Sequence, residues 1–329
     1  MNILITGANG FVGQGLTKRL LEVGQIGQQT ITRLTLLDRQ FDEVLFEKIS
    51  STKVPSIKIE KYSGDLSDGT WLWDTLSGST IDVIFHLASI PGGMAEQNDS
   101  LARKVNIDAT MTLLEIAKAQ TENGQGKPIF VFASSIAVFG KMPDFVNDDT
   151  PLKPQLSYGA HKIVGEVMIN DFSRRGWVDG RSLRLPGILA RPPAKTGQLS
   201  AFLSDIIREL ARGNHFVCPM SEKATTWASS LPNIVDNLLH AACIDAAKLT
   251  YDRAITLPTL CFNMAELVQA IGDAYDQPVK ELVTYEVNTH IERLFGCFPS
   301  LITAKADQLG FQHDGDLMNL VKKALPSEG

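Results

Sequence analysis

A tyrosine and a lysine four residues apart, Tyr158 and Lys162, could carry out acid–base chemistry together. On a helix this spacing places both side chains on one face, a turn apart. A tyrosine phenol titrates at about pH 10 and becomes a useful base only where a neighbouring cation favours its anion. Lys162 could supply that cation and make Tyr158 a general base. Because such pairs also arise by chance, the prediction depends on the residues around them.

Two serines, Ser134 and Ser135, precede this pair and follow the apolar segment Ile129–Phe132. We expect that segment to be a strand, and the carboxyl end of a strand is where an α/β sheet presents polar groups to a ligand. A serine hydroxyl there could hydrogen-bond the substrate oxygen that loses its proton. Asn106, at the start of another expected helix, is either a simple helix-start residue or one that bends the helix or holds a proton-relaying water.

A glycine-rich segment at the N-terminus has the spacing Gly7, Gly10, Gly13. It follows an expected strand, Asn2–Thr6, and opens an expected helix, Phe11–Val23. Glycine allows a tight turn and lets the backbone approach a pyrophosphate, while the start of the helix attracts the phosphate charge. In this context the spacing predicts a dinucleotide-binding turn.

Asp38 ends the second expected strand and could accept hydrogen bonds from both hydroxyls of an adenosine ribose. Its charge would repel a 2′-phosphate, so NAD is favoured over NADP, although Arg39 beside it could weaken that preference. Asp65 and Leu66 follow the third strand and could line the adenine pocket, but Asp65 could equally be a turn residue.

The N-terminal half alternates short β-branched strands with longer helical patterns. This alternation is typical of a Rossmann-type α/β fold with a doubly wound parallel sheet. We expect an NAD-binding domain over residues 1–185 and a smaller substrate-binding lobe over 186–329, from which some elements return to the sheet. Besides those already named, the expected strands are Arg33–Asp38, Ile57–Ser63, Asp82–Leu87, Pro128–Ala133, Arg181–Leu185 and Ala254–Leu257, and the expected helices are Asp108–Gln120, Tyr158–Arg174, Leu199–Arg212, Leu231–Ile244 and Met264–Tyr275.

Composition excludes several other classes of protein. The net charge of −6 argues against nucleic acid or an anionic membrane as the partner, and no apolar run is long enough for a membrane span. The four cysteines lie far apart, without a Cys-x-x-Cys pair, which indicates reduced and mostly buried thiols in a cytoplasmic protein. The scattered histidines predict no metal site, and His86 is expected to serve packing or backbone support.

Taken together, these segments resemble the extended short-chain dehydrogenases/reductases, the NAD-dependent epimerase/dehydratase family, over essentially the whole chain. The resemblance implies that Tyr158 is the general base and that Lys162 binds the nicotinamide ribose and lowers the pKa of the tyrosine. It makes Ser135 the catalytic serine and places Ser134 against the cofactor. The residues that carry the resemblance or its implied cofactor contacts are Gly7, Asn9, Gly10, Phe11, Val12, Gly13, Asp38, Asp65, Leu66, His86, Leu87, Ala88, Asn106, Ser134, Ser135, Tyr158, Lys162, Pro186 and Ile188.

Two kinds of activity within this family are disfavoured. The sugar 4,6-dehydratases carry an Asp-Glu pair just after the catalytic hydroxyl residue, whereas Ile136 and Ala137 follow Ser135 here. Nucleotide-sugar epimerases usually carry an arginine that pairs with the diphosphate, whereas the comparable segment Ala224–Ala228 has none. Epimerisation of a nucleotide-sugar nevertheless stays open as an alternative.

Several segments resemble a narrower group, the D-erythronate dehydrogenases, which oxidise C2 of a four-carbon sugar acid with NAD. The similar segments are Ile31–Asp38, Ser134–Gly140, Asp171–Gly176, Arg184-Leu185-Pro186 and Ala190-Arg191-Pro192. The resemblance implies NAD-dependent oxidation of the C2 hydroxyl of a small sugar acid such as D-erythronate. The chain departs from this group in two loops, Ser89–Met94 and Pro193–Ser200.

A small hydroxy acid needs a fixed cation for its carboxylate, and Arg191 is the expected partner unless it is a surface arginine. Thr196, Ser200 and Trp227 could line the same pocket. A non-catalytic NAD-sensing protein is the alternative of another class, and the presence of Ser135, Tyr158 and Lys162 together argues against it. The family often dimerises through the helices that correspond to Asp108–Gln120 and Tyr158–Arg174, so we expect a homodimer.

Overall fold

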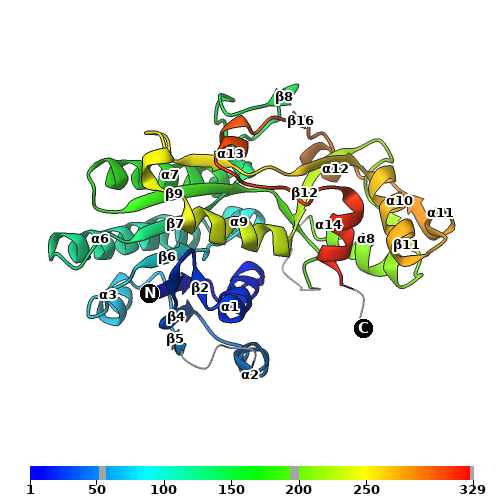
Figure 1. Ribbon diagram of the computed structural model, residues 1–329. Coiled ribbons are helices and arrows are strands. Elements are labelled where there is room, and N and C mark those ends of the chain that lie inside the picture. Colours follow the sequence, from blue (N-terminus) through cyan, green and yellow to red (C-terminus); the bar gives the residue numbers. More distant parts are fainter. Residues whose placement is uncertain (52–56, 193–199, 327–329) are drawn as a thin grey trace. The chain divides into compact units, whose positions relative to one another are not determined.

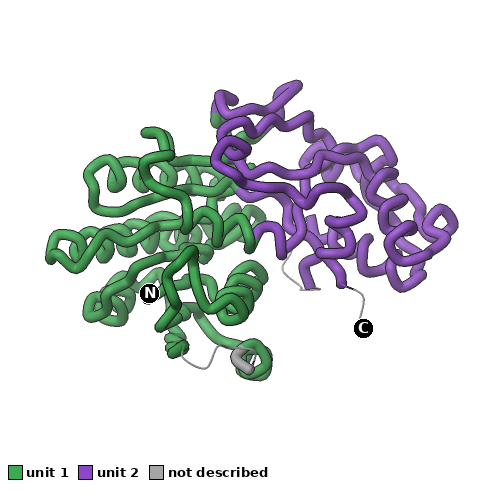
Figure 2. The backbone as a smooth tube through the Cα atoms, in the orientation of Figure 1, with its two compact units in different colours: residues 1–140, 152–184, 235–255 green, residues 141–151, 185–234, 256–329 purple. Residues whose placement is uncertain are grey.

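The computed structural model describes residues 1–51, 57–192 and 200–326. The chain divides into two compact units (Figure 2). The first contains residues 1–140, 152–184 and 235–255, and the second contains residues 141–151, 185–234 and 256–329. Residues 141–151 thus belong to the second unit, although the sequence interpretation groups them with the N-terminal domain, and residues 235–255 return to the first.

The first unit is built on a seven-stranded sheet with the strand order β13-β9-β7-β6-β1-β4-β5 (Figure 1). β1 pairs in parallel with both β4 and β6, β4 with β5, and β6 with β7. The strand order reverses at β1, as predicted for a doubly wound sheet. In sheets of this kind, ligands bind beyond the carboxyl ends of the strands at this point, which here are β1 and β6. The strands are β1 (Asn2–Thr6), β4 (Arg33–Asp38), β5 (Lys58–Ser63), β6 (Val83–His86), β7 (Ile129–Ser135), β9 (Asp179–Leu185) and β13 (Ala254–Thr256).

Most strands of this sheet are apolar, and helices pack against the sheet and bury them. Leu113 and Leu114, Ile169, and Leu72 pack with strand residues such as Phe130 in one core. The helices and short elements of this unit are α1 (Phe11–Val23), β2 (Gln25–Ile26), β3 (Gln29–Thr30), α2 (Glu43–Ser51), α3 (Gly69–Leu76), α4 (Gly92–Gln97), α5 (Asp99–Arg103), the π-helix η1 (Lys104–Asp108), α6 (Ala109–Glu122), η2 (Ile136–Val138), α7 (Ser157–Arg174), α9 (Leu231–Cys243, in this unit from residue 235) and η3 (Ala246–Lys248).

The second unit has its own core, formed mainly by α8, α10 and α14 against a small sheet of the order β10-β12-β14. Two further strand pairs, β11–β15 and β8–β16, complete it. Its elements are β8 (Phe145–Val146), β10 (Gly187–Leu189), α8 (Phe202–Ala211), β11 (Phe216–Cys218), β12 (Thr225–Ser230), β14 (Leu260–Asn263), α10 (Met264–Tyr275), α11 (Val279–Leu282), β15 (Val283–Tyr285), α12 (Thr289–Phe295), β16 (Ser300–Leu301), α13 (Ala304–Gln308) and α14 (Leu317–Ala324).

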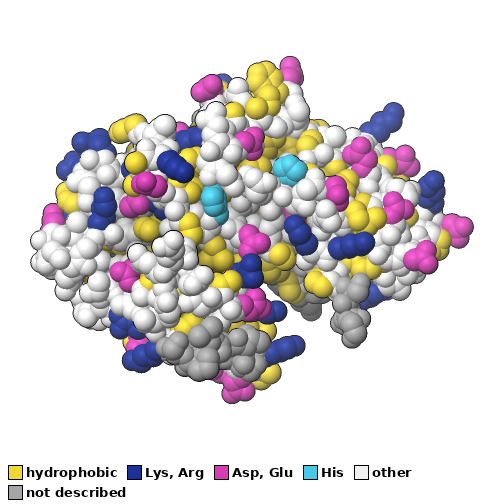
Figure 3. Space-filling model, viewed as in Figure 1, with side chains coloured by type: hydrophobic (Ala, Val, Ile, Leu, Met, Phe, Trp, Pro, Cys, Tyr) yellow, Lys and Arg dark blue, Asp and Glu magenta, His cyan; other side chains and the backbone are white. Residues whose placement is uncertain are grey.

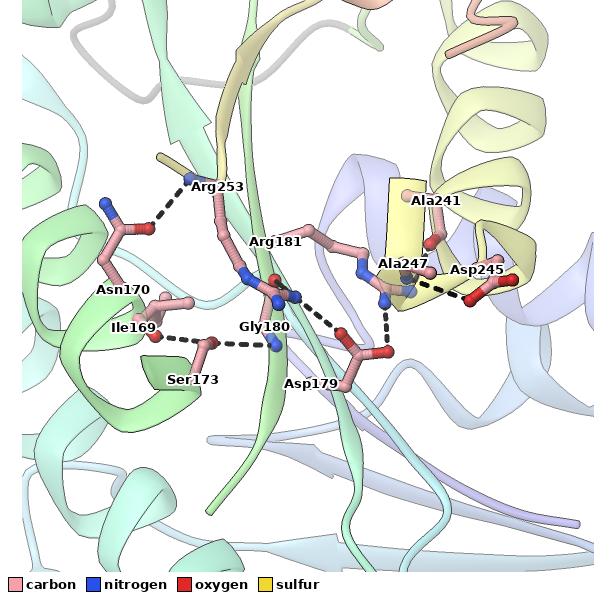
Figure 4. Close-up of polar contacts among 10 residues, drawn as sticks. All are labelled: Ile169, Asn170, Ser173, Asp179, Gly180, Arg181, Ala241, Asp245, Ala247 and Arg253. Atoms are coloured by element: carbon pink, nitrogen blue, oxygen red, sulfur yellow. Dashed lines mark hydrogen bonds and ion pairs between the residues drawn. The ribbon is translucent and has the colours of Figure 1, made fainter. Parts of the chain in front are cut away.

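A buried ion-pair cluster anchors the start of β9 (Figure 4). The Asp179 carboxylate accepts from the guanidinium of Arg181 and, at 2.7 Å, from Arg253 Nη1. Arg181 is fully buried and also donates to the carbonyl of Ala241 near the end of α9. One carboxylate therefore joins the first residues of β9 to α9 and to the segment that enters β13. Asn170 on α7 accepts from Arg253 N at 3.0 Å and adds a fourth element.

The cysteines differ from expectation in one respect. All four are free thiols, but only Cys218 is buried, whereas Cys243, Cys261 and Cys297 are exposed. The prediction of mostly buried thiols is wrong because Cys243 ends α9, Cys261 lies on an outward position of β14, and Cys297 follows α12.

The distribution of charged side chains on the surface agrees with the modest net charge of −6. On the face drawn in Figure 3, acidic and basic side chains are interspersed. Within residues 1–51, 57–192 and 200–326, no helix is sufficiently long and apolar to span a membrane. In the same part of the chain, no group of three or more His, Cys, Asp or Glu side chains could hold a metal ion.

Candidate active site

The turn after β1 is shaped by Gly7. Its φ of 71° lies in the left-handed region, and its N–H donates to the carbonyl of Leu37 at 2.9 Å. A Cβ on this residue would lie 2.7 Å from the backbone nitrogen of Ala88. No side chain fits there, so the turn presents bare backbone at the point where the strand order reverses.

The start of α1 lies directly on this turn. A Cβ on Gly13 would lie 2.1 Å from the carbonyl oxygen of Gly7, so only glycine lets the helix pack this closely. Gly10 is the N-cap and has no capping side chain. The positive end of the helix dipole is thus directed at the turn, which is the arrangement that binds a pyrophosphate. Asn9, Phe11 and Val12 belong to the same segment, and the cradle fits a dinucleotide.

Asp38 lies beside the turn at the end of β4. Its Oδ2 accepts from the backbone N–H of Asn9 at 2.8 Å, and its Oδ1 accepts from that of Arg39 at 2.7 Å. The two bonds fix the carboxylate, and each oxygen can still accept a further hydrogen bond. Such a carboxylate suits a ribose with free hydroxyls and repels a 2′-phosphate, which favours NAD.

The remaining predicted cofactor residues occupy different settings. Leu87 and Ala88 are partly buried and directly follow β6, so they lie at the same edge of the sheet as Gly7. Asp65 is exposed and accepts from Ser67 N at 2.9 Å, as a turn residue does. Leu66 is buried and packs in the core of the first unit. Pro186 and Ile188 are buried and follow β9 in the second unit.

His86 is the last residue of β6, and its buried ring lies between Thr6 and Thr110. Its Nδ1 lies 2.6 Å from Thr6 Oγ1, and its Nε2 lies 2.8 Å from Thr110 Oγ1. Complete burial lowers the pKa of His86 to about 3, and the charge of Lys162 lowers it further. The neutral ring therefore links the ends of β1 and β6 to α6, in a supporting role that needs no metal.

Tyr158 and Lys162 lie one turn apart at the start of α7, and two glycines let this helix approach the sheet. A Cβ on Gly159 would lie 2.4 Å from the carbonyl oxygen of Ala137 in η2, the short helix that follows Ser135. A Cβ on Gly165 would lie 2.7 Å from the ring of Phe132 on β7. The contacts hold the start of α7 against the segment that carries Ser135.

Lys162 is buried beneath the predicted general base. Its Nζ lies 5.3 Å from the centre of the Tyr158 ring and 4.7 Å from that of Phe132, distances at which a cation interacts with an aromatic face. Burial lowers the pKa of Lys162 to about 7, while the negative charge of Glu166 acts to raise it. A lysine side chain with this pKa can change between its ammonium and neutral amine forms near physiological pH.

The two serines have different environments. Ser135 is partly exposed and is the N-cap of η2, where its hydroxyl oxygen accepts from Ala137 N at 3.2 Å. Ser134 is buried and donates to Glu166 Oε1 at 2.5 Å. Ser135 can therefore hydrogen-bond a ligand, whereas the hydroxyl of Ser134, which we expected to contact the cofactor, is engaged by a protein carboxylate.

Asn106 lies in the π-helix η1, where the helical hydrogen-bond ladder widens between α5 and α6. Its Oδ1 accepts from Ile90 N at 2.7 Å, and its Nδ2 donates to Ile90 O at 3.0 Å. Nδ2 also lies 3.3 Å from His161 Nδ1 on α7. Asn106 thus marks a local distortion of the helix and holds the loop after β6 close to α7.

The predicted substrate residues belong to the second unit. Arg191 follows β10 and is partly exposed, its backbone N–H donates to Ser204 Oγ at 3.0 Å, and Ser200 just precedes α8. Trp227 is 1% exposed and donates its ring N–H to the carbonyl of Pro299, so it is a core residue. Thr196 lies outside the described residues.

Two residues near the site were not predicted from the sequence. Glu166 lies on α7, one turn after Lys162, and is buried. Arg184 on β9 donates to it twice, from Nε at 3.0 Å and from Nη2 at 2.8 Å. The spacing of Lys162 and Glu166 was a usable signal, because side chains four apart share a helix face. The partnership with Arg184 depends on the fold.

Comparisons with known proteins group this chain with one family of enzymes. The model of the NAD dependent epimerase/dehydratase family matches residues 3–228. A D-erythronate dehydrogenase of Cupriavidus necator is 36% identical to the chain, and the match covers 100% of the chain and 99% of that protein. A second D-erythronate dehydrogenase, of Haemophilus influenzae, is 33% identical over 98% of each.

Solved structures give the same grouping. The structure of a nucleoside-diphosphate-sugar epimerase from Agrobacterium tumefaciens matches with a TM-score of 0.88 and 31% identity, over 100% of this chain and 94% of that one. The family model matches more than half of the chain, and the two relatives match along essentially its full length. This chain belongs to the NAD-dependent epimerase/dehydratase family of extended short-chain dehydrogenases/reductases.

Proposed function

We propose that the chain is an NAD-dependent dehydrogenase that oxidises the C2 hydroxyl of a small sugar acid such as D-erythronate. The observation that best supports this is the buried Lys162, whose Nζ lies 5.3 Å from the centre of the Tyr158 ring. An ammonium at this position favours the phenolate form of Tyr158 and makes it a base near neutral pH. The two relatives named as D-erythronate dehydrogenases support the substrate class.

Each residue of the site has a role in this proposal. Tyr158 takes the proton of the C2 hydroxyl, and Ser135 donates a hydrogen bond that orients the same oxygen. Lys162 stabilises the phenolate and binds the nicotinamide ribose. NAD, when bound, accepts the hydride from C2. Asn106 holds the loop after β6 against α7, and Asp38 binds the adenosine ribose.

The carboxylate of the substrate requires a cation, for which we propose Arg191, with Ser200 and Thr196 as further candidate substrate residues. Arg191 is partly exposed at the end of β10, and its backbone is fixed by Ser204 and by Arg208, which donates to its carbonyl. A guanidinium can bind a carboxylate through two parallel hydrogen bonds. Trp227 is omitted because it is buried in the core.

Epimerisation of a nucleotide-sugar is the second candidate function. The similarity to the nucleoside-diphosphate-sugar epimerase structure supports it. Against it, the segment over residues 224–228 contains no arginine to pair with a diphosphate. For this reason we favour the dehydrogenase.

We further propose that the chain acts as a homodimer in the cytoplasm, assembled through α6 and α7. Val164 and Val167 lie on α7 and are 39% and 57% exposed, which leaves apolar surface on one of these two helices. The free thiols support a reducing compartment.

Replacing Tyr158 by Phe tests the assignment of the base. Tyr158→Phe removes the group that accepts the proton but keeps the ring, so kcat with D-erythronate should fall by about 100-fold or more. The dissociation constant for NAD, measured by calorimetry, should change by less than about twofold, because binding and proton transfer are separate. The matched control is Tyr251→Phe, since Tyr251 is 71% exposed and interacts with Arg174, at the opposite end of α7 from Tyr158. A kcat near that of the wild type in Tyr158→Phe would exclude Tyr158 as the base.

A further inference from the structure

A carboxylate that the proposed reaction does not use is buried directly behind the predicted general base. Glu166 is 3% exposed and lies on α7, one turn beyond Lys162 and two turns beyond Tyr158. Burying a carboxylate is costly unless hydrogen bonds and an opposite charge compensate it. The groups that form hydrogen bonds and ion pairs with the Glu166 carboxylate therefore indicate its role.

Three hydrogen bonds hold the Glu166 carboxylate, and they come from two strands. Oε1 accepts from the hydroxyl of Ser134 at 2.5 Å and from Arg184 Nε at 3.0 Å, and Oε2 accepts from Arg184 Nη2 at 2.8 Å. Ser134 is the neighbour of Ser135 on β7, and Arg184 lies near the end of β9. All three side chains are buried. One carboxylate thus joins the residue next to the catalytic serine to the helix that carries the base.

The negative charge of Glu166 also interacts with the ammonium of Lys162. Residues four apart on a helix lie on the same face, and α7 is continuous from Tyr158 through Glu166. Burial disfavours the ammonium form of Lys162, and among the described groups Glu166 is the one whose charge opposes this effect. Eight residues separate Glu166 from Tyr158, about 12 Å along the helix axis, so its direct effect on the phenol is weaker.

We propose that Glu166 is a positioning residue of this site: its buried carboxylate keeps Lys162 charged beneath Tyr158 and, through Ser134, fixes the strand end that carries Ser135. The proposal rests on the proposed dehydrogenase chemistry, in which Tyr158 must ionise beside a cation. The titratable and charged groups that interact with Lys162 or Glu166 are Tyr158 and His161 on α7, His86 on β6 and Arg184 on β9. His86 is neutral because its pKa is about 3.

The ionisation of Tyr158 itself provides the test, and it needs no substrate. The tyrosinate absorbance of the full chain is titrated with pH, with and without NAD, and the titration of Tyr158→Phe is subtracted to isolate Tyr158. In Glu166→Gln, Lys162 loses its proton at lower pH, so Tyr158 no longer has a cation beside it. The midpoint of Tyr158 ionisation should rise by about one pH unit or more. The midpoint should stay unchanged or fall in Arg184→Met, because the negative charge near Lys162 is then less compensated.

Two controls separate this role from simple loss of stability. Asp179→Asn also breaks a buried ion pair of the first unit and should lower the melting temperature while leaving the Tyr158 midpoint unchanged. Ser134→Ala keeps the charge and should likewise leave the midpoint unchanged, but it should lower kcat because the position of Ser135 is less fixed. If Glu166→Gln does not fold, Glu166→Gln combined with Arg184→Met leaves no arginine buried without an anionic partner, and the midpoint should still rise.

A wild-type midpoint in Glu166→Gln, or shifts in the same direction in Glu166→Gln and Arg184→Met, would overturn the proposal. That result would differ from failure of the proposed function. A wrong substrate class would leave the midpoint shifts intact while no sugar acid is oxidised, whereas a Tyr158 that does not titrate below the ordinary phenol range in the wild type would contradict the catalytic role itself.

Discussion

At the scale of single residues, Lys162 shows how the site balances burial against charge. The lysine is 2% exposed, and the pKa of its ammonium is about 7, far below its ordinary value. In the unfolded chain its pKa returns to about 10.4. Below about pH 7 both states bind the proton, and the folded protein carries the full cost of a buried ammonium. Between about pH 7 and pH 10 the unfolded chain binds more protons, so stability rises with pH.

Replacing Lys162 by Met should reveal this cost. Lys162→Met removes the buried charge, and the variant should be more stable than the wild type at about pH 6, by a few kcal/mol. The difference should shrink as the pH rises to about 10. Urea unfolding at both pH values measures it, with Lys18→Met as the control, because the Lys18 side chain on α1 is exposed. A difference that does not depend on pH would mean that Lys162 titrates normally in the folded protein.

At the scale of elements, the start of β9 depends on one carboxylate. Asp179→Asn would leave Arg181 buried without an anionic partner and would weaken the hold on Arg253. Removing one member of a buried pair typically destabilises a protein by about 3–5 kcal/mol. Urea unfolding should show a loss of this size. Asp171→Asn, which breaks exposed pairs on α7, should change stability much less, and equal losses in the two variants would contradict this explanation.

Elements with strong local signals were predictable from the sequence. The bounds of β1, α1, β4 and α10 match the structure, because each has a clear apolar pattern and a distinct end. The C-cap of α1 is Gly24, whose φ of 66° suits glycine, and the N-cap of α10 is Asn263, which forms a capping box with Glu266. The π-helix was not predicted, because a single widened turn leaves no periodic pattern in the sequence.

The candidate site was predictable to a similar extent. The glycine turn, Asp38 and the Tyr158–Lys162 pair are local motifs with a fixed spacing. The contacts of Glu166 were not predictable, because they join α7 to β7 and β9 across 18 and more residues of sequence. The small sheets of the second unit were missed for the same reason, since β8 pairs with the distant β16.

At the scale of the whole molecule, the predicted functions divide between the two units. The residues for the dinucleotide turn and for proton transfer lie in the first unit, whereas Arg191 and Ser200 lie in the second. The proposed function therefore assigns cofactor binding mainly to the first unit and substrate selection to the second. The substrate class is therefore the central claim that most needs a measurement.

The most direct measurement is NADH formation by the purified protein with NAD and a panel of C4 to C6 aldonic acids. NADP, and a UDP-sugar without added acid, serve as comparisons. We predict NADH formation with D-erythronate or a closely similar acid, a preference for NAD over NADP, and loss of turnover in Tyr158→Phe. Interconversion of the UDP-sugar without net NADH, together with no turnover of any sugar acid, would contradict the proposed function and favour an epimerase.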